Sequence, residues 1–238
     1  MANDYFEFKQ FRIQQDRCGM KVSTDACLFG SFVTKPGAKN ILDIGTGTGL
    51  LTLMLAQRHP NSQITAVEID SDAFQQALEN FKNSPWYDRL NIEHASIQEF
   101  VQATDKKFDL IICNPPFYPD HIKSSDQKRS KAFHNDHLSF SDLAQSCSKL
   151  ISDSGEFFLL LPERQSREFE QIAKRCGLFL QTSTKVRGTV KGKVIREIGS
   201  YSKKKVDDIP ENEIAINSEP GVYTEEFTRF MKPYYLFL

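Results

Sequence analysis

The sequence predicts a single α/β domain built on a mainly parallel sheet of seven strands, with an antiparallel C-terminal hairpin and helices on both faces. Two observations predict this fold. From residue 40 to residue 177, short apolar runs alternate with helix-like segments, which is typical of parallel strands joined by helices that cover both faces. Two further strand-like runs, 178–187 and 194–202, flank the short turn 188–193, so they should pair antiparallel.

The N-terminal part, residues 1–35, is expected to cover one end of the domain. Phe6, Phe8 and Phe11 alternate with polar residues, a pattern that fits an edge strand or a hairpin. Segment 24–33 is expected to be a short helix, because Ser23 or Thr24 can cap its N-terminus and an acidic residue follows in its first turn.

The first strand of the core, 40–44, runs directly into the glycine-rich turn 43–49, and an apolar helix, 50–57, follows. Glycines let the backbone approach a ligand closely, and a helix N-terminus offers N–H donors to a carboxylate or phosphate. The next strand, 64–69, carries Glu68, which lies 23 residues after Gly45 and can accept hydrogen bonds from both hydroxyls of a ribose. The two strand ends predict a site for a nucleoside cofactor.

The remaining core elements continue the alternation. The helices are expected at 71–83, 139–151 and 163–176, and the strands at 91–95, 108–113 and 155–161. In the first of these helices Phe74, Ala77, Leu78 and Phe81 share an apolar face. We therefore expect one domain over 1–238, with a cover (1–35), a cofactor-binding core (36–177) and a C-terminal hairpin and tail (178–238), in which segments 213–217 and 227–238 pack back on the domain.

Strand 108–113 is followed by Asn114-Pro115-Pro116-Phe117. The prolines lack an N–H and fix φ, so they end the strand in a stiff turn. The Asn114 side-chain oxygen and the Pro115 carbonyl can together accept both hydrogens of a planar amino group, and the Phe117 ring can stack on the attached π-system. Asn-Pro pairs are also ordinary turn formers, so the motif alone leaves a tight turn and an amino-group site equally open.

Composition excludes several classes of protein. The 30 basic and 31 acidic residues give no overall signal for a polyanion partner. The five cysteines form no Cys-x-x-Cys pair, which argues against zinc and redox sites and for a reducing compartment. The N-terminus lacks an apolar signal core, and no apolar run reaches membrane-spanning length. We expect a cytoplasmic protein with no membrane contact and no metal, acting as a monomer.

Three residue types allow a second interpretation. Cys113 could be a nucleophile, but its place inside a strand favours a buried, inert thiol. His134 and His137 could bind a metal, but two histidines in a polar loop are more often solvated. Asp43 could be a general acid or base, although its place before the glycine turn favours a binding role.

Two segments predict contact with a nucleic-acid backbone. Segment 118–138 is a long polar loop with four basic residues, Lys123, Lys128, Arg129 and Lys131, and a loop of this length in a compact domain is usually functional or disordered. Segment 185–205 carries eight basic residues against one acidic residue, Glu197. We favour phosphate contact over a solvated hairpin face. The side chains expected to make that contact are Lys185, Arg187, Lys191 and Lys193.

The glycine turn does not complete the nicotinamide fingerprint Gly-x-Gly-x-x-Gly, because Leu50 stands at the third glycine position. In combination, Asp43, the glycines, Glu68 and Asn-Pro-Pro-Phe resemble the class I S-adenosylmethionine-dependent methyltransferases that act on amino groups, over residues 40–161. A narrower resemblance covers nearly the whole chain. Motifs at 8–11, 20–26, 223–227 and 234–236 are similar to those of the bacterial tRNA1(Val) (adenine(37)-N6)-methyltransferases.

This resemblance implies a Rossmann-like domain that binds S-adenosylmethionine and methylates an adenine N6 in tRNA. It implies that the methionine part of the cofactor is lined by Asp43, Gly45, Thr46, Gly47 and Gly49, the ribose is held by Glu68, the adenine is framed by Ile69, Ser96 and Ile97, and Asn114 completes the cofactor site. Catalysis would fall to Asn114, Pro115, Pro116 and Phe117. Family members usually carry an acidic residue near Ser96 and often Tyr at position 117.

Three rival functions stay open. Asn-Pro-Pro-Phe is also common in rRNA guanine-N2 methyltransferases, although those usually continue with His where this chain has Tyr118. Protein glutamine-N5 methyltransferases would present an amide to the same pocket, but they usually carry Tyr at position 117 and a separate N-terminal helical domain, for which 238 residues leave no room. A non-catalytic RNA-binding module is the third, and the complete motif set argues against it.

Overall fold

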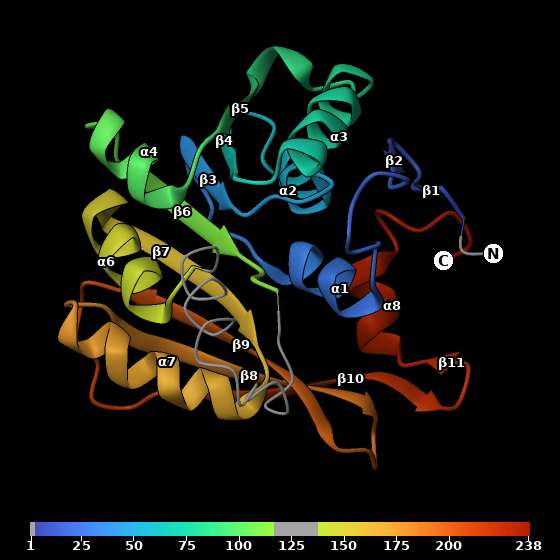
Figure 1. Ribbon diagram of the computed structural model, residues 1–238. Helices are drawn as coiled ribbons and strands as arrows, with labels where there is room; N and C mark the ends of the chain where they lie inside the picture. Colours follow the sequence, from blue (N-terminus) through green and yellow to red (C-terminus); the bar gives the residue numbers. More distant parts are fainter. Residues whose placement is uncertain (1–2, 117–137) are drawn as a thin grey trace, which may run out of the picture.

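The computed structural model describes residues 3–116 and 138–238 (Figure 1). Several predicted residues lie outside these described residues: Phe117, the four basic residues of the 118–138 loop, and His134 and His137. A central sheet of nine strands has the order β11-β10-β8-β9-β7-β6-β3-β4-β5.

Five neighbouring strands of this sheet are parallel, as the alternation of strands and helices predicts. They are β3 (Asn40–Ile44), β4 (Gln63–Glu68), β5 (Leu90–His94), β6 (Phe108–Cys113) and β7 (Ile151–Leu161). The predicted hairpin is confirmed: β8 (Phe179–Thr189) pairs antiparallel with β9 (Val194–Ser202), which in turn pairs antiparallel with β7.

The tail extends the sheet beyond the seven expected strands. β10 (Glu211–Glu219) pairs parallel with β8, and the short β11 (Val222–Tyr223) pairs with β10. Without β10, the edge of β8 would leave its backbone N–H and C=O groups unpaired. The tail therefore packs back on the domain by adding strands.

Helices cover both faces of the sheet, and two apolar clusters fill the space beneath them. One face carries α1 (Thr24–Phe32), α2 (Leu50–Arg58), α3 (Ser71–Lys82) and α8 (Glu225–Met231). The other carries α4 (Ile97–Ala103), α6 (Phe140–Leu150) and α7 (Glu163–Arg175). Neighbouring residues of β6 alternate between the clusters, as the period of a strand requires: Leu110 and Ile112 face one, Ile111 and Cys113 the other.

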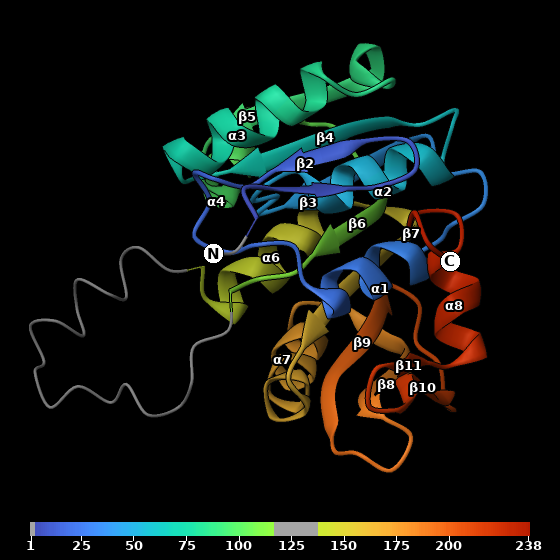
Figure 2. The ribbon, with the colours of Figure 1, turned by 90° about the vertical axis from the view of Figure 1, so that its right-hand side faces the viewer.

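The N-terminal cover is a hairpin of β1 (Tyr5–Glu7) and β2 (Arg12–Gln14). It joins the rest through Phe8, Phe11 and Ile13, which are buried in the first cluster. The Lys9 side chain also donates to the Leu238 carbonyl at 2.9 Å, so the turn of this hairpin touches the C-terminal residue. Figure 2 shows α1 and α8 side by side beneath this hairpin. The short 3-10 helix Tyr87–Arg89 precedes β5.

Candidate active site

The carboxyl ends of β3, β4 and β6 lie at one edge of the sheet. Ile44 of β3 pairs with Val67 of β4 on one side and with Cys113 of β6 on the other. The residues that follow these positions, Gly45, Glu68 and Asn114, therefore meet at this edge, where open parallel sheets bind their ligands. The structure thus brings the glycine turn, the acidic strand end and the Asn-Pro-Pro motif together.

The glycine turn needs its glycines for two different reasons. Gly45, Gly47 and Gly49 all have positive φ, at 68°, 57° and 84°. Residues with a Cβ adopt this backbone conformation only at a cost in free energy. A Cβ added at Gly45 or Gly47 would have no atom of the described residues within 4 Å, whereas a Cβ added at Gly49 would lie 2.5 Å from Cε1 of Phe81. The first two glycines border open space, and the third is packed against α3.

Asp43 is fully buried below this turn, with 0% of its surface exposed. Its Oδ2 accepts hydrogen bonds from the hydroxyls of Thr46 at 2.6 Å and Thr52 at 2.8 Å. Its Oδ1 has no hydrogen-bond partner among the described residues. Burial raises the pKa of Asp43 to about 6, against the smaller opposing effect of the two hydroxyls. One carboxylate oxygen is held rigidly, and the other is left to accept a further donor.

Glu68 ties the glycine turn to the end of β4. Its Oε2 accepts from the Gly47 amide at 2.8 Å, and its Oε1 accepts from the amides of Ile69 and Asp70 at 2.9 and 3.0 Å. Oε1 thus already accepts two hydrogen bonds, whereas Oε2 has a second lone pair for a further one. The neighbouring Ile69 side chain is 60% exposed, so an apolar surface lies beside this carboxylate.

Ser96 has a role at a helix terminus that sequence reasoning did not anticipate. It caps α4, its hydroxyl donates to Glu99 at 2.7 Å, and its amide donates to the same carboxylate at 2.9 Å. This hydrogen bonding lowers the pKa of Glu99. Glu99 is thus engaged in capping α4, and the Ser-x-x-Glu spacing was the sequence signal that could have revealed this role. Ile97 is 5% exposed and belongs to the second cluster.

Asn114 follows β6 with an unused hydrogen-bond acceptor. Its Oδ1 is buried and has no partner within residues 3–116 and 138–238. The preceding Cys113 is 1% exposed, and burial raises the pKa of its thiol well above the usual range. The prediction of a buried Cys113 is confirmed, and a thiol in this state is a poor nucleophile. β6 ends at Cys113, so Pro115 and Pro116 lie outside the strand, as the motif predicts.

The β8–β9 hairpin places its basic residues unequally. Lys185 and Arg187 form ion pairs with Glu211 at 3.0 Å and Glu213 at 2.6 Å on the adjacent β10. Lys191 and Lys193, at the hairpin tip, are exposed and form no ion pair in the part of the chain that the structure describes. Because Leu161 of β7 pairs with Glu197 of β9, this tip projects from the edge that carries the glycine turn.

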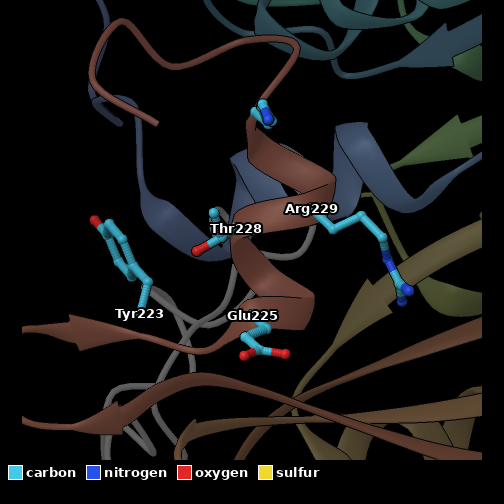
Figure 3. A pocket seen from close by; sticks show the side chains of 5 residues that line it. Tyr223, Glu225, Thr228 and Arg229 are labelled. Atoms are coloured by element: carbon cyan, nitrogen blue, oxygen red, sulfur yellow. The ribbon is translucent and has the colours of Figure 1, made fainter.

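A separate hollow of about 390 Å³ lies against α8 (Figure 3). It is lined by Tyr223, Glu225, Thr228, Arg229 and Lys232. None of the predicted site residues contributes to this hollow, so it is distinct from the strand-end site. The described residues contain no helix long and apolar enough to cross a membrane, and no group of three or more His, Cys, Asp or Glu side chains that could hold a metal ion.

The fold and this site define an S-adenosylmethionine-dependent methyltransferase. The family model of the methyltransferase small domain matches residues 20–135. Among solved structures, a predicted O-methyltransferase from Agrobacterium tumefaciens has a similar fold, with a TM-score of 0.65, 19% identity, and 87% of this chain and 95% of that chain covered. A glycopeptide N-methyltransferase complexed with S-adenosylmethionine has a TM-score of 0.56 at 14% identity, over 79% of this chain and 96% of that chain.

The chain belongs to the tRNA1(Val) (adenine(37)-N6)-methyltransferase family. The relative of that name from Flavobacterium johnsoniae is 40% identical over 97% of this chain and 99% of its own length. Those from Trichodesmium erythraeum and Cytophaga hutchinsonii are 43% and 42% identical, each over 99% of both chains.

Proposed function

We infer that this chain transfers a methyl group from S-adenosylmethionine to the exocyclic N6 of an adenine in tRNA, with position 37 of tRNA1(Val) as the target. The observation that carries this proposal is the Oδ1 of Asn114, which is buried at the edge that also holds the glycine turn and has no hydrogen-bond partner among the described residues. Leaving a buried acceptor unpaired costs about 1–3 kcal/mol. A substrate amino group that donates to Oδ1 would recover this cost.

The residues present fit the cofactor. A methionine group requires a hydrogen-bond acceptor and open space, which are offered by Asp43 Oδ1, without a partner among the described residues, and by the surroundings of Gly45 and Gly47. A ribose hydroxyl can donate to the free lone pair of Glu68 Oε2. The proposed binding residues are Asp43, Gly45, Thr46, Gly47 and Gly49 for the methionine part, Glu68 for the ribose, and Ile69, Ser96 and Ile97 for the adenine. When bound, the cofactor supplies an electrophilic methyl group on a sulfonium.

The chain's own contribution is to orient the nucleophile. The N6 lone pair of adenine is delocalised into the ring, so the free amine is a poor nucleophile. Acceptance of its two hydrogens by Asn114 Oδ1 and the Pro115 carbonyl favours a pyramidal nitrogen with the lone pair directed at the methyl carbon. The N–C bond forms as the S–C bond breaks, and the methylated nitrogen then loses a proton to water. Phe117 is proposed to stack on the unstacked base.

Contact with tRNA is proposed for the β8–β9 hairpin, through Lys185, Arg187, Lys191 and Lys193. The ion pairs to Glu211 and Glu213 offset the charge of the first two. Most of the attraction to phosphate should therefore come from Lys191 and Lys193 at the tip.

The proposal also covers the domain organisation, the oligomeric state and the cellular location of the protein. We propose one methyltransferase domain over 1–238, because a single sheet contains strands from both 36–177 and 178–238. We further propose a monomer that acts in the cytoplasm. Sedimentation equilibrium of the purified chain, with and without tRNA, tests the oligomeric state, since a dimer would double the 27.2 kDa mass.

The direct test of the function is nucleoside mass spectrometry of tRNA from a strain that lacks this protein. We expect N6-methyladenosine to disappear from tRNA1(Val), to return with the wild-type gene, and to stay absent with Asn114→Ala. Loss of N2-methylguanosine would overturn the adenine assignment in favour of guanine. Methyl transfer to a glutamine amide, with tRNA unchanged, would favour the protein-modifying alternative.

A further inference from the structure

Helix α3 buries two side-chain amides on the face that packs against the domain. Gln76 is 0% exposed and Asn80 is 1% exposed. Amides at such positions are destabilising unless their polar groups are paired. Partners for the Asn80 amide and for the side-chain oxygen of Gln76 come from a segment far away in the sequence, residues 12–22, which runs from β2 toward α1 and which we call the N-terminal strap. The Gln76 Nε2 has no hydrogen-bond partner among the described residues. β2 lies next to α3 (Figure 2).

Asn80 bonds the strap and the glycine turn at the same time. Its Oδ1 accepts from the Gln14 amide at 2.9 Å, and its Nδ2 donates to the Gln14 carbonyl at 2.9 Å. The same Nδ2 donates to the Thr48 carbonyl at 2.8 Å. Thr48 stands between Gly47 and Gly49, the glycines that shape the turn. The buried side-chain amide of Asn80 therefore links the backbone of the strap to the backbone of the glycine turn.

The strap is held along its length by further side chains. Gln76 Oε1 accepts from the Arg17 amide at 3.0 Å, and the Arg17 guanidinium pairs with Glu79 at 2.9 Å. Gln15 Oε1 accepts from the Val22 amide at 2.8 Å, which closes the strap into a loop. Because the strap bonds to α3 at Gln14 and at Arg17, a shift of α3 would move the strap with it.

The strap lies close to the glycine turn, because Gln14 of the strap and Thr48 of the turn bond the same Asn80 amide, at 2.9 and 2.8 Å. Cys18, further along the strap, is half-buried. Burial raises the pKa of its thiol to about 11, and nearby carboxylates add to this shift.

We propose that Asn80 is a positioning residue that couples cofactor binding at the glycine turn to ordering of the N-terminal strap. A ligand that fixes the turn fixes the Thr48 carbonyl, and through the Asn80 amide it fixes the backbone of Gln14. By linkage, an ordered strap strengthens cofactor binding by the same factor. This inference rests on the proposed cofactor site at the glycine turn.

Hydrogen exchange measured by mass spectrometry tests the coupling, with S-adenosylhomocysteine as the probe. In the wild-type chain, the probe should slow exchange of the strap amides at least about threefold, together with those of the glycine turn. In Asn80→Ala, the turn should still gain protection, the strap should not, and the calorimetric Kd should rise about tenfold. Gln75→Ala is the matched control, since Gln75 is an exposed amide on the same helix, and it should behave as wild type.

Each possible result bears on the proposal. Strap protection that survives in Asn80→Ala would mean that the strap touches the ligand directly, and it would overturn the coupling role. Wild-type binding of the probe without strap protection would overturn it as well, even if the variant cannot be folded. Failure of the wild-type chain to bind the probe at all would instead count against the proposed methyltransferase function.

Discussion

Asp43 is buried, and one of its carboxylate oxygens has no partner among the described residues. Its pKa, raised to about 6 by burial, lies above the ordinary value for aspartate. The stability that this shift contributes is therefore fully present below the unfolded-state pKa and is lost as pH rises through about 6. The ionised form of Asp43 is thus destabilised by burial in the free protein, and a cationic ligand group would stabilise it.

This charge state predicts a pH-dependent cofactor affinity. If the ammonium group of the cofactor binds only ionised Asp43, the Kd for S-adenosylhomocysteine should fall about fourfold from pH 5.5 to pH 7.5, as the ionised fraction rises. Isothermal titration calorimetry at the two pH values measures this. Asp43→Asn should bind more weakly and show a flat profile. A variant that keeps the wild-type pH dependence would assign the titration to another group.

Glu68 is expected to contribute to cofactor affinity through the ribose. Glu68→Ala should weaken binding of S-adenosylhomocysteine by about 1–3 kcal/mol, the worth of one or two hydrogen bonds. Because Glu68 also accepts from the Gly47 amide, part of this loss would come from a looser turn. Glu68→Gln keeps one acceptor oxygen and should lose less. Wild-type affinity of Glu68→Ala in calorimetry would remove this residue from the site.

At the scale of elements, the junction between the glycine turn and α2 depends on the absence of a Cβ at Gly49. Gly49→Ala should be destabilised by the positive φ, which costs about 1–2 kcal/mol, and additionally by the clash with Phe81. Gly37→Ala is the matched control, since Gly37 has a φ of 80° and no neighbour within 4 Å of its would-be Cβ. Urea unfolding of both variants separates the two effects. Equal losses would show that Phe81 moves aside freely.

The β8–β9 hairpin predicts a salt-dependent affinity for tRNA. Lys191→Glu combined with Lys193→Glu should weaken binding and make the plot of log affinity against log salt shallower by roughly two, one for each lost phosphate contact. Cofactor affinity should not change. Filter binding at several salt concentrations measures both the affinity and the slope.

Two further double substitutions serve as controls for the hairpin variant. Lys106→Glu with Lys107→Glu makes the same charge change before β6, at the sheet edge opposite Asn114, and should weaken tRNA binding much less. Lys185→Ala with Arg187→Ala should lie between, because Glu211 and Glu213 already offset those charges. A salt-independent affinity of the wild-type chain would show that the hairpin is only a solvated face.

Elements with strong local signals could be predicted from the sequence, and those defined by distant partners could not. The glycine turn and the parallel strands carry their own patterns of glycine and apolar residues. Helix α4 was missed because it has seven residues and only two buried ones, Ile97 and Phe100, too few for a periodic signal. The pairing of Lys185 with Glu211 depends on the parallel register of β8 and β10, which no local pattern specifies.

Helix α3 shows the same limit at the level of side chains. The sequence assigns its buried face to apolar residues, including Phe74 and Leu78, which prove to be only half-buried. The fully buried positions include Gln76 and Asn80 instead. Asn80 and the side-chain oxygen of Gln76 bond backbone groups of the strap, up to 66 residues away, so hydropathy alone places these two residues on the wrong face.

For the whole molecule, the position of the site follows from how the sheet is assembled. Pairing of β3 with both β4 and β6 brings the glycine turn, Glu68 and Asn114 to one edge. The antiparallel β8–β9 hairpin then projects its basic tip from the same edge. A cofactor at the turn and a nucleic acid on the tip would therefore meet near Asn114, which makes this side chain the central test.

Single-turnover methyl transfer to unmodified tRNA, with the product nucleoside identified, tests this claim most directly. Asn114→Ala should lower the rate constant about 100-fold or more, as expected for loss of one preorganised hydrogen-bonding group that acts mainly in the transition state. Affinities for tRNA and S-adenosylhomocysteine should change little, Asn114→Asp should keep partial activity, and Asn61→Ala, an exposed asparagine in the turn before β4, should match wild type. An Asn114→Ala enzyme that methylates adenine N6 at a near wild-type rate would contradict the account.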